Sequence, residues 1–307
     1  MEKKVYDLII LGGGPASMSA GIYASQMKLD TLLIEKDSFG GQITTTSSIS
    51  NYPGFTEISG EELSLRMHNH LTSTNINISR EEVTKTILNE DIKQVHTHNN
   101  IYYSKSVIIG IGTRLRNLGV DNENYYLGKG LSYLALKDGD KFLDRDVAVI
   151  GGGNSAIEDA LFLSEKCRKV YLVHRRQQFR GDEQLIEQLH NKSNIELVLE
   201  HKPIQIVGKS RIEKLILKHI PSDSIRELNV DAIFVAIGRG ADTDVIDENI
   251  ARDNNGYIIT NQLMETNLSG VYAIGDIRNT PLRQIVTALS DGAIASVSAN
   301  KFIRNIK

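Results

Sequence analysis

The sequence predicts an α/β fold made of two Rossmann-like (βαβ), three-layer nucleotide-binding domains, and three observations support this prediction. The chain has 307 residues, which is more than a single compact domain usually holds. The apolar runs 5–11 and 146–150 each lead directly into three glycines. A helical pattern and a second apolar run follow each glycine turn, so one βαβ unit occurs twice along the chain.

The other elements follow from short apolar runs and from helical periodicity. Strands are expected at 5–11, 31–34, 106–109, 146–150, 170–173, 195–199, 212–217 and 232–236. Helices are expected at 16–27, 155–164 and 282–306. Residues 70–105 combine polar residues with short β-like runs, which predicts a small sheet inserted in the first domain. Glycines near 112–114 and 238–242 are typical of short extended crossings, so we expect the domain joints there.

The composition is that of a soluble globular protein. Hydrophobic residues make up 40% and charged residues 24%, and the formal net charge of −3 gives no basic field for nucleic acid. No apolar run is long enough to span a bilayer, and the apolar N-terminal run ends in glycines rather than in a cleavage site. We therefore expect a cytoplasmic protein that binds neither nucleic acid nor membranes and has no metal site.

The sequence contains one cysteine, Cys167. A single cysteine can form neither an internal disulfide nor a CxxC redox pair, which also favours the cytosol. Cys167 comes after a helical pattern and just before a strand, with no histidine or asparagine pattern around it. We interpret it as a structural, half-buried thiol and not as a nucleophile.

The first glycine turn has the features of a dinucleotide fingerprint. Gly12 allows a tight turn, Gly14 lets the backbone approach a pyrophosphate, and the following helix presents free N–H groups to the phosphates. Ser17 takes the third fingerprint position, where its small size keeps helix and strand close. Glu35 ends the second strand, where a carboxylate accepts hydrogen bonds from a ribose diol. Together these features predict a nucleotide site at this turn.

The second glycine turn carries Gly151, Gly153 and Ala156 in a GxGxxA pattern. The next strand ends in HRRQQFR, so Arg175 and Arg176 stand where the first site has its glutamate, with Arg180 close behind. Guanidinium groups bind a 2′-phosphate with charge-assisted hydrogen bonds, whereas a carboxylate repels it. The pattern therefore predicts NADPH rather than NADH as the coenzyme. His174 either helps to hold the adenosine or packs at the strand end.

Several further motifs occur in the order found in one known family. GGGPAS, GGQITTT (40–46), NYPGF (51–55), GGGNSAIEDA, HRRQQFR, GVYAIGD (270–276) and RQIVTALSDGAIAS (283–296) cover essentially the whole chain. With these motifs the chain resembles the low-molecular-weight thioredoxin reductases. The resemblance implies an FAD-binding domain of residues 1–113 and 242–307, interrupted by an NADPH-binding domain of residues 114–241. It also implies a homodimer and a relative rotation of the two domains.

The fingerprints and the resemblance together assign the cofactor sites. In that family the aspartate at the position of Asp276 contacts the ribityl chain, and the segment matching 283–285 lies beside the isoalloxazine. The residues assigned to FAD are Gly12, Gly14, Pro15, Ala16, Ser17, Glu35, Gly41, Gln42, Asn51, Asp276, Arg283, Gln284 and Ile285. Those assigned to NADPH are Gly151, Gly153, Asn154, Ser155, Ala156, His174, Arg175, Arg176, Arg180 and Gly238.

The chain departs from the family at the redox-active cysteines. The family carries a segment like SYCATCDG, whereas residues 132–139 read SYLALKDG, with Leu134 and Lys137 at the two cysteine positions. Neither residue can exchange with a disulfide, so the dithiol relay is expected to be absent. Asp138 matches the family's proton-donating acid and, without a thiolate, is expected to be a turn residue. A leucine and a lysine favour natural divergence, since engineered replacements are usually serine or alanine.

The expected function is an NADPH-dependent FAD oxidoreductase that passes electrons from reduced FAD directly to an acceptor. Candidate acceptors are ferredoxin, flavodoxin, free flavin, a quinone or oxygen. Alternatives are a thioredoxin reductase with inactivated cysteines and a redox sensor without turnover. Lys137 either places a positive charge near the flavin or is a solvated lysine. Lys129, Lys137, Lys141 and Arg145 either form a basic patch for an acidic carrier or are ordinary surface residues.

Overall fold

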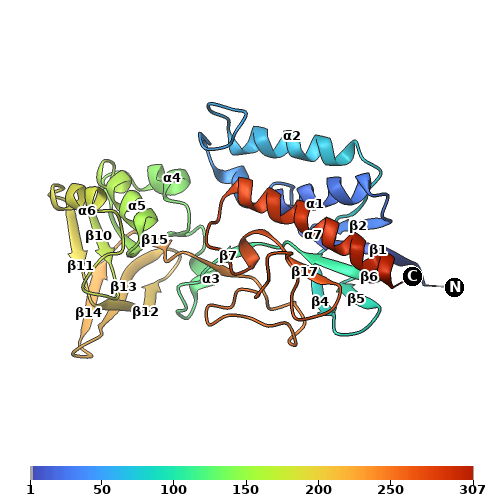
Figure 1. Ribbon diagram of the computed structural model, residues 1–307. Coiled ribbons are helices and arrows are strands. Elements are labelled where there is room, and N and C mark those ends of the chain that lie inside the picture. Colours follow the sequence, from blue (N-terminus) through green and yellow to red (C-terminus); the bar gives the residue numbers. More distant parts are fainter. Residues whose placement is uncertain (1–2, 307) are drawn as a thin grey trace. The chain divides into compact units, whose positions relative to one another are not determined.

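The computed structural model describes residues 3–306 and divides the chain into two compact units (Figure 1). The outer unit comprises the described residues up to Arg114 and those from Gly240 on, and the inserted unit comprises Leu115–Arg239. The sequence placed these boundaries after residues 113 and 241. The crossing segments β7 (Thr113–Leu115) and β16 (Arg239–Ala241) pair as a two-stranded sheet.

The outer unit is built on one seven-stranded sheet, in which five strands are parallel. The order along the sheet is β3-β2-β1-β6-β5-β4, and β17 pairs with β6. The parallel strands are β1 (Val5–Leu11), β2 (Thr31–Ile34), β3 (Asn77–Ser79), β6 (Ile101–Ile109) and β17 (Val271–Ala273). The strand expected at 106–109 is therefore the second half of a longer strand.

The prediction of a small sheet inserted at 70–105 was wrong, because the strands of this region belong to the main sheet. Residues up to Thr72 belong to helix α2 (Gly60–Thr72), and β3 joins the parallel part of the main sheet. The antiparallel strands β4 (Val83–Ile87) and β5 (Lys93–Thr97) extend the same sheet. This is possible because β6 is nine residues long, so that its first half pairs with β5 and its second half with β17.

Three layers make up the outer unit. The helices α1 (Pro15–Gln26), α2 and α7 (Ile285–Asn305) cover one face of the sheet, packing on Leu8, Ile10 and Ile108 (Figure 1). The other face carries Ile9, Leu11 and Val107 and is covered by the segment of residues 245–268 and by Ile277. Alternate residues of β1 thus enter opposite cores, as strand geometry requires.

The inserted unit repeats this architecture around a five-stranded parallel sheet of order β11-β10-β9-β15-β8. Its strands are β8 (Leu131–Ser132), β9 (Asp146–Gly151), β10 (Lys169–Val173), β11 (Ile195–Val198) and β15 (Ala232–Ala236). One face carries α4 (Ala135–Asp138), α5 (Asn154–Ser164) and α6 (Glu183–His190). The other is covered by the antiparallel sheet of β12 (His201–Gly208), β13 (Ile212–His219) and β14 (Ile225–Asn229).

Short helical turns complete the chain. These are α3 (Glu123–Tyr126), η1 (Gly41–Thr45), η2 (Gly139–Phe142) and η3 (Gly275–Ile277). Within residues 3–306 no helix combines the length and apolar character needed to cross a membrane. The α/β prediction with two Rossmann-like βαβ folds is confirmed, because each unit contains a parallel sheet in which one strand, β1 or β9, leads through glycines into a helix.

Candidate functional site

The first glycine turn joins β1 to α1 and leaves an open position at the helix start. Gly12 has a φ of +97°, and a Cβ there would lie 2.6 Å from the carbonyl oxygen of Gly110. Gly14 caps α1, and a Cβ at this residue would meet nothing within 4 Å. Pro15 occupies the first helical turn, where its missing N–H costs nothing. The exposed backbone and the helix dipole together form a phosphate cradle.

Two fingerprint residues of this turn pack inside the protein. The Ser17 hydroxyl is fully buried and lies 3.4 Å from the carbonyl oxygen of Leu11 and 3.3 Å from that of Gly110. Ala16 is also buried, 3.1 Å from the position of a Cβ on Gly275. Ser17 therefore keeps α1 close to the sheet, as a small residue at this position should.

Glu35 lies at the end of β2 and reaches the glycine turn. Its Oε2 accepts the backbone N–H of Gly13 at 2.5 Å, and its Oε1 accepts that of Asp37 at 2.8 Å. Each carboxylate oxygen has a second lone pair, so Glu35 can still accept hydrogen bonds from a ribose diol. Phe39 also lies against the turn, 3.0 Å from where a Cβ on Gly13 would lie. The first cradle thus has the shape and the polar groups that an FAD nucleotide requires.

The predicted flavin-contacting residues form two groups in the outer unit. Gln42 donates a hydrogen bond to Thr113 Oγ1 at 2.8 Å, and its Nε2 lies 3.5 Å from Asp276 Oδ2. Gly41 precedes Gln42, and a Cβ there would lie 3.5 Å from the Cα of Gly14. The loop of residues 40–46 and the 275–277 turn therefore meet beside the phosphate cradle. Sequence reasoning missed Thr113, because its segment was taken only as a domain joint.

The second group surrounds the start of α7. Asn51 donates a hydrogen bond to Gln284 Oε1 at 3.0 Å, and Gln284 caps the helix through a reciprocal capping box. The guanidinium of Arg283 lies 4.2 Å from the ring centroid of Tyr257, a contact that the motif analysis did not foresee. Ile285 packs against a small apolar cluster in the outer unit.

An ion pair between the half-buried Arg278 and the buried Asp291 ties the 275–278 turn to α7. The Arg278 guanidinium donates to Asp291 from Nε at 2.8 Å and from Nη2 at 3.2 Å. The same carboxylate accepts the backbone N–H of Gly275 at 3.0 Å. Arg278 also donates to Thr260 Oγ1 at 3.0 Å. Because Asp276 lies between these anchored residues, its backbone is held in place.

The second glycine turn joins β9 to α5 in the inserted unit. A Cβ on Gly151 would lie 2.4 Å from the Ala236 carbonyl oxygen and 2.6 Å from the Ala156 Cβ, so Gly151 and the buried Ala156 bring helix and sheet together. Gly153 caps α5 and, like Gly14, has no atom within 4 Å of the position of a Cβ. The exposed Ser155 follows in the first turn of the helix.

The arginine loop that follows β10 exposes its three cationic side chains, those of Arg175, Arg176 and Arg180. His174 is buried instead and fills the space beside Gly152, where a Cβ would lie 2.2 Å from the imidazole. Its Nε2 lies 3.2 Å from the Gln178 carbonyl oxygen, and burial lowers the pKa of the ring. Of the two roles expected for His174, this geometry favours packing.

Asn154 and Gly238, two residues assigned to NADPH, each form hydrogen bonds with other residues of the inserted unit. The Asn154 amide exchanges two hydrogen bonds with Asp182, each at 2.9 Å. Gly238 has a φ of +87°, and its carbonyl oxygen accepts the N–H of Arg116 at 3.1 Å. No atom lies within 4 Å of a Cβ placed on Gly238, which leaves its backbone accessible.

The segment at the family's cysteine positions is held by Asp138. Asp138 Oδ2 accepts the Ser132 hydroxyl at 2.7 Å, and Oδ1 pairs with the Lys141 ammonium at 2.7 Å. Ser132 Oγ in turn accepts the backbone N–H of Leu134 at 3.0 Å. The hydrogen-bonded ammonium of Lys141 lowers the pKa of Asp138, with the nearby Lys137 adding to the effect. An ionised, hydrogen-bonded carboxylate fixes this turn and is unsuited to proton donation near neutral pH.

Apolar side chains are exposed on this segment. Leu136 is 70% exposed and Leu134 40% exposed. Of the four basic residues considered as a docking patch, Lys141 pairs with Asp138, Arg145 lies 3.9 Å from Asp231, and Lys129 lies over the Tyr125 ring. Acidic neighbours thus offset part of the positive charge, which weakens the case for a basic docking patch.

Cys167 is buried, and its thiol donates to the Phe142 carbonyl oxygen at 3.3 Å. Burial raises the pKa of the thiol to about 11. Such a thiol is unreactive near neutral pH, in agreement with a structural role. Within residues 3–306 no cluster of three or more metal-ligating side chains occurs.

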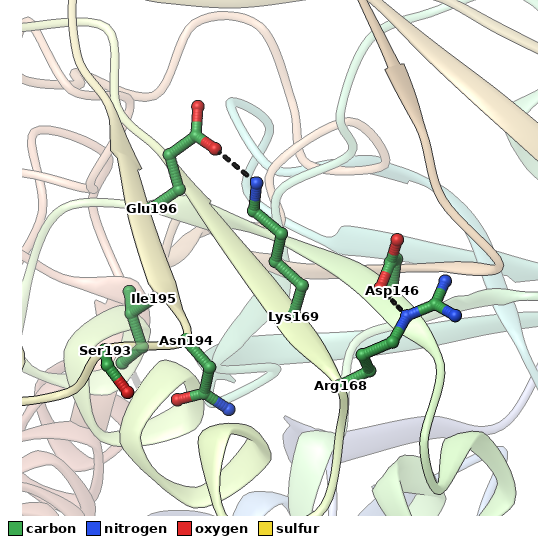
Figure 2. A pocket seen from close by; sticks show the side chains of 7 residues that line it. All are labelled: Asp146, Arg168, Lys169, Ser193, Asn194, Ile195 and Glu196. Atoms are coloured by element: carbon green, nitrogen blue, oxygen red, sulfur yellow. Dashed lines mark hydrogen bonds and ion pairs between the residues drawn. The ribbon is translucent and has the colours of Figure 1, made fainter.

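The inserted unit has a surface hollow, whose lining side chains are drawn in Figure 2. Asp146, Lys169 and Ile195 line it, and each stands at the beginning of a parallel strand. Glycine turns follow the carboxyl ends of such strands, so the hollow is at the opposite edge of the sheet. Its charged groups pair with one another, Lys169 with Glu196 and Arg168 with Asp146.

Comparisons with known proteins identify the family to which the chain is similar. Residues 6–292 match the family described as pyridine nucleotide-disulphide oxidoreductase. A 34.2 kDa protein in the rubredoxin operon of Clostridium pasteurianum is 37% identical over 303 residues, covering 98% of both chains. Thioredoxin reductase of Mycoplasma genitalium is 37% identical over 296 residues, covering 96% of this chain and 94% of that protein.

Solved structures with a similar fold include thioredoxin reductases as well. The thioredoxin reductase of Lactococcus lactis, in its FR conformation, has a TM-score of 0.84 at 34% identity and covers 98% of this chain and 99% of its own. A ferredoxin-flavin thioredoxin reductase of Clostridium acetobutylicum has a TM-score of 0.56 at 27% identity, covering 99% of this chain and all of its own. The thioredoxin reductase family uses FAD and NADPH, the two cofactors that the sequence predicts.

Proposed function

The chain belongs to the pyridine nucleotide-disulphide oxidoreductase family, and from this premise we propose that it is an NADPH-dependent FAD oxidoreductase that works without a protein dithiol. FAD and NADPH supply the hydride chemistry when bound. The protein's part is to bind and orient them and to exclude competing reactions. The observation that carries the proposal is the turn at residues 132–138, which has Leu134 and Lys137 at the cysteine positions and an ion-paired Asp138.

In this proposal the two cradles differ in the charge beside them. In the outer unit Gly12 and Gly14 present backbone to the FAD pyrophosphate, and Glu35 accepts the ribose diol. In the inserted unit Gly153 presents backbone to NADPH, and the exposed Arg175 and Arg176 bind the 2′-phosphate. A negative charge at the first site and positive charges at the second sort the two nucleotides.

The acceptor then takes its electrons without a thiol relay. The exposed Leu134 and Leu136 give the turn at residues 132–138 an apolar surface, and Leu134 stands where the family has a reactive cysteine. One relative is named for a rubredoxin operon, and one structural neighbour is named a ferredoxin-flavin enzyme. For this reason rubredoxin and ferredoxin should be tested as acceptors together with flavodoxin, free FMN, a quinone and oxygen.

The test is stopped-flow mixing of the FAD-loaded protein with NADPH without oxygen, followed by the acceptor panel. We expect rapid bleaching of the flavin band, turnover with at least one acceptor and near-background reduction of DTNB or thioredoxin. No bleaching over minutes would favour a redox sensor without turnover. Rapid NADPH-dependent reduction of thioredoxin would contradict the interpretation that Leu134 and Lys137 abolish the dithiol relay.

The coenzyme assignment has its own control. Arg175→Ala with Arg176→Ala should weaken NADPH binding about tenfold or more and leave NADH binding nearly unchanged, since each guanidinium–phosphate contact is charge-assisted. Equal efficiency of NADH and NADPH in the unaltered protein would defeat the 2′-phosphate argument. We further propose a cytosolic homodimer, which light scattering coupled to size exclusion would test.

A further inference from the structure

The arginine loop is docked on the second phosphate turn through three hydrogen bonds. Arg180 donates its backbone N–H to the Gly152 carbonyl oxygen at 2.8 Å. Asp182 donates its backbone N–H to Asn154 Oδ1 at 2.9 Å. Asn154 Nδ2 donates to Asp182 Oδ2 at 2.9 Å. Residues 28 positions apart are thus joined by a reciprocal side-chain and backbone pair.

The fit between the loop and the helix start is close. A Cβ on Gly181 would lie 2.3 Å from Ile157 Cδ1 and 3.0 Å from Asn154 Oδ1. Asn154 is the first residue of α5 and directly follows the open Gly153. The phosphate turn and the arginine loop are therefore packed together and hydrogen-bonded, and Asn154 makes two of the hydrogen bonds between them.

We propose that Asn154 and Asp182 are positioning residues that set the coenzyme preference by holding the arginine loop beside the phosphate turn. The inference rests on the proposed NADPH site. Binding a phosphate costs conformational entropy, because both the arginine side chains and the loop that carries them become ordered. A loop whose backbone is already fixed avoids the backbone part of this cost. NADH has no 2′-phosphate, so its affinity should depend little on this pair.

Electrostatics alone predicts the opposite result. Asp182 is an acidic residue two positions after Arg180, and a carboxylate near the arginine loop repels a 2′-phosphate. If Asp182 acted only through its charge, its removal would strengthen NADPH binding. A positioning role predicts that loss of its hydrogen bond weakens NADPH binding, so the sign separates the two explanations.

The experiment compares Asp182→Ala with Asp182→Asn in the full FAD-loaded chain. Both variants remove the negative charge, but only asparagine can still accept the Asn154 N–H. The FAD is first reduced without oxygen, so that no hydride transfer follows coenzyme binding, and dissociation constants for NADPH and NADH are then measured by titration calorimetry. We expect Asp182→Asn to keep or raise the preference for NADPH. Asp182→Ala should lower it about fivefold relative to Asp182→Asn, the value of one net hydrogen bond.

Two further variants complete the design. Asn154→Ala removes both hydrogen bonds of the pair and should lower the NADPH preference at least as much as Asp182→Ala does. The double variant should lose no more than Asn154→Ala alone. Glu183→Ala removes a neighbouring exposed acid that makes no bond to Asn154, and it should leave the preference unchanged or slightly raised. Thermal unfolding of each variant reports any general destabilisation.

The outcomes separate this inference from the proposed function. Equal NADPH preference in Asp182→Ala and Asp182→Asn would overturn it, as would parallel losses of NADPH and NADH affinity. Either result could occur while Arg175→Ala with Arg176→Ala still weakens NADPH binding, and the coenzyme site would then stand without this positioning pair. If the arginine variants bind NADPH normally, the assignment of the coenzyme site itself fails.

Discussion

Asp159 offers a sharp test of the electrostatics of the inserted unit. It lies on α5, two turns after the phosphate turn, and its side chain is partly buried. Burial, aided by the negative charge of Glu158, raises the pKa of Asp159 from its ordinary value of 3.8 to about 6. Ionisation of this carboxyl therefore opposes folding, and replacement by the neutral amide in Asp159→Asn should stabilise the unit at neutral pH.

The size of the effect follows from the shift. A pKa raised by about two units corresponds to about 3 kcal/mol of destabilisation once the group is fully ionised. Asp159 does not lower the free energy of unfolding below its ordinary pKa of 3.8, and the loss develops as the pH rises through about 6. Because solvent still reaches the side chain, we expect Asp159→Asn to add about 1–3 kcal/mol near pH 8. Near pH 4 the gain should fall to about 0.5 kcal/mol or less.

Urea unfolding of the ligand-free chain at the two pH values measures this difference. The matched control is Glu158→Gln, which removes the exposed neighbouring charge and should stabilise the unit only slightly. A gain from Asp159→Asn that is the same near pH 4 and near pH 8 would refute the argument. A carboxyl whose pKa is raised in the folded protein must destabilise it more at pH 8 than at pH 4.

Three other predictions concern the interior. Asp291→Asn leaves the Arg278 guanidinium buried without its counter-charge and should cost about 3–5 kcal/mol of unfolding free energy, with weaker FAD retention; the pair Arg278→Met with Asp291→Leu should recover much of that stability. Gly292→Ala places a Cβ 2.2 Å from the Ala16 carbonyl oxygen and should cost about 1–3 kcal/mol in urea unfolding, whereas Gly256→Ala, a surface position with open space around it, should show only the cost of its backbone conformation. Cys167, with a pKa of about 11, should react with DTNB near pH 8 only after unfolding, and fast reaction of the native chain would contradict its buried position.

Local chemistry explains what could be predicted from the sequence. A strand that enters Gly12 or Gly151 and a helix that follows are set by residues within one βαβ unit, so their bounds were predicted to within a few residues. The charge contrast between Glu35 and the arginines was readable for the same reason. These features depend on neighbours in the sequence and require no knowledge of the remaining chain.

Long-range pairing explains what could not be predicted. The sheet extension through β5 depends on the length of β6, since a shorter β6 would leave no edge for β5. The Asn154–Asp182 pair and the packing of His174 on Gly152 join segments that carry no common pattern. Asn154 was assigned to NADPH from its motif, and only the structure places its amide against Asp182.

The double pairing of β6 has a consequence for how the chain is made. Its partner β17 lies at Val271–Ala273, beyond the whole inserted unit, and α7 follows only after that. A nascent chain therefore emerges with a continuous inserted unit that can close its own core while the outer sheet still lacks a strand and its longest helix. On the ribosome the second nucleotide cradle is expected to form first, and the first cradle, although encoded earlier, is completed last.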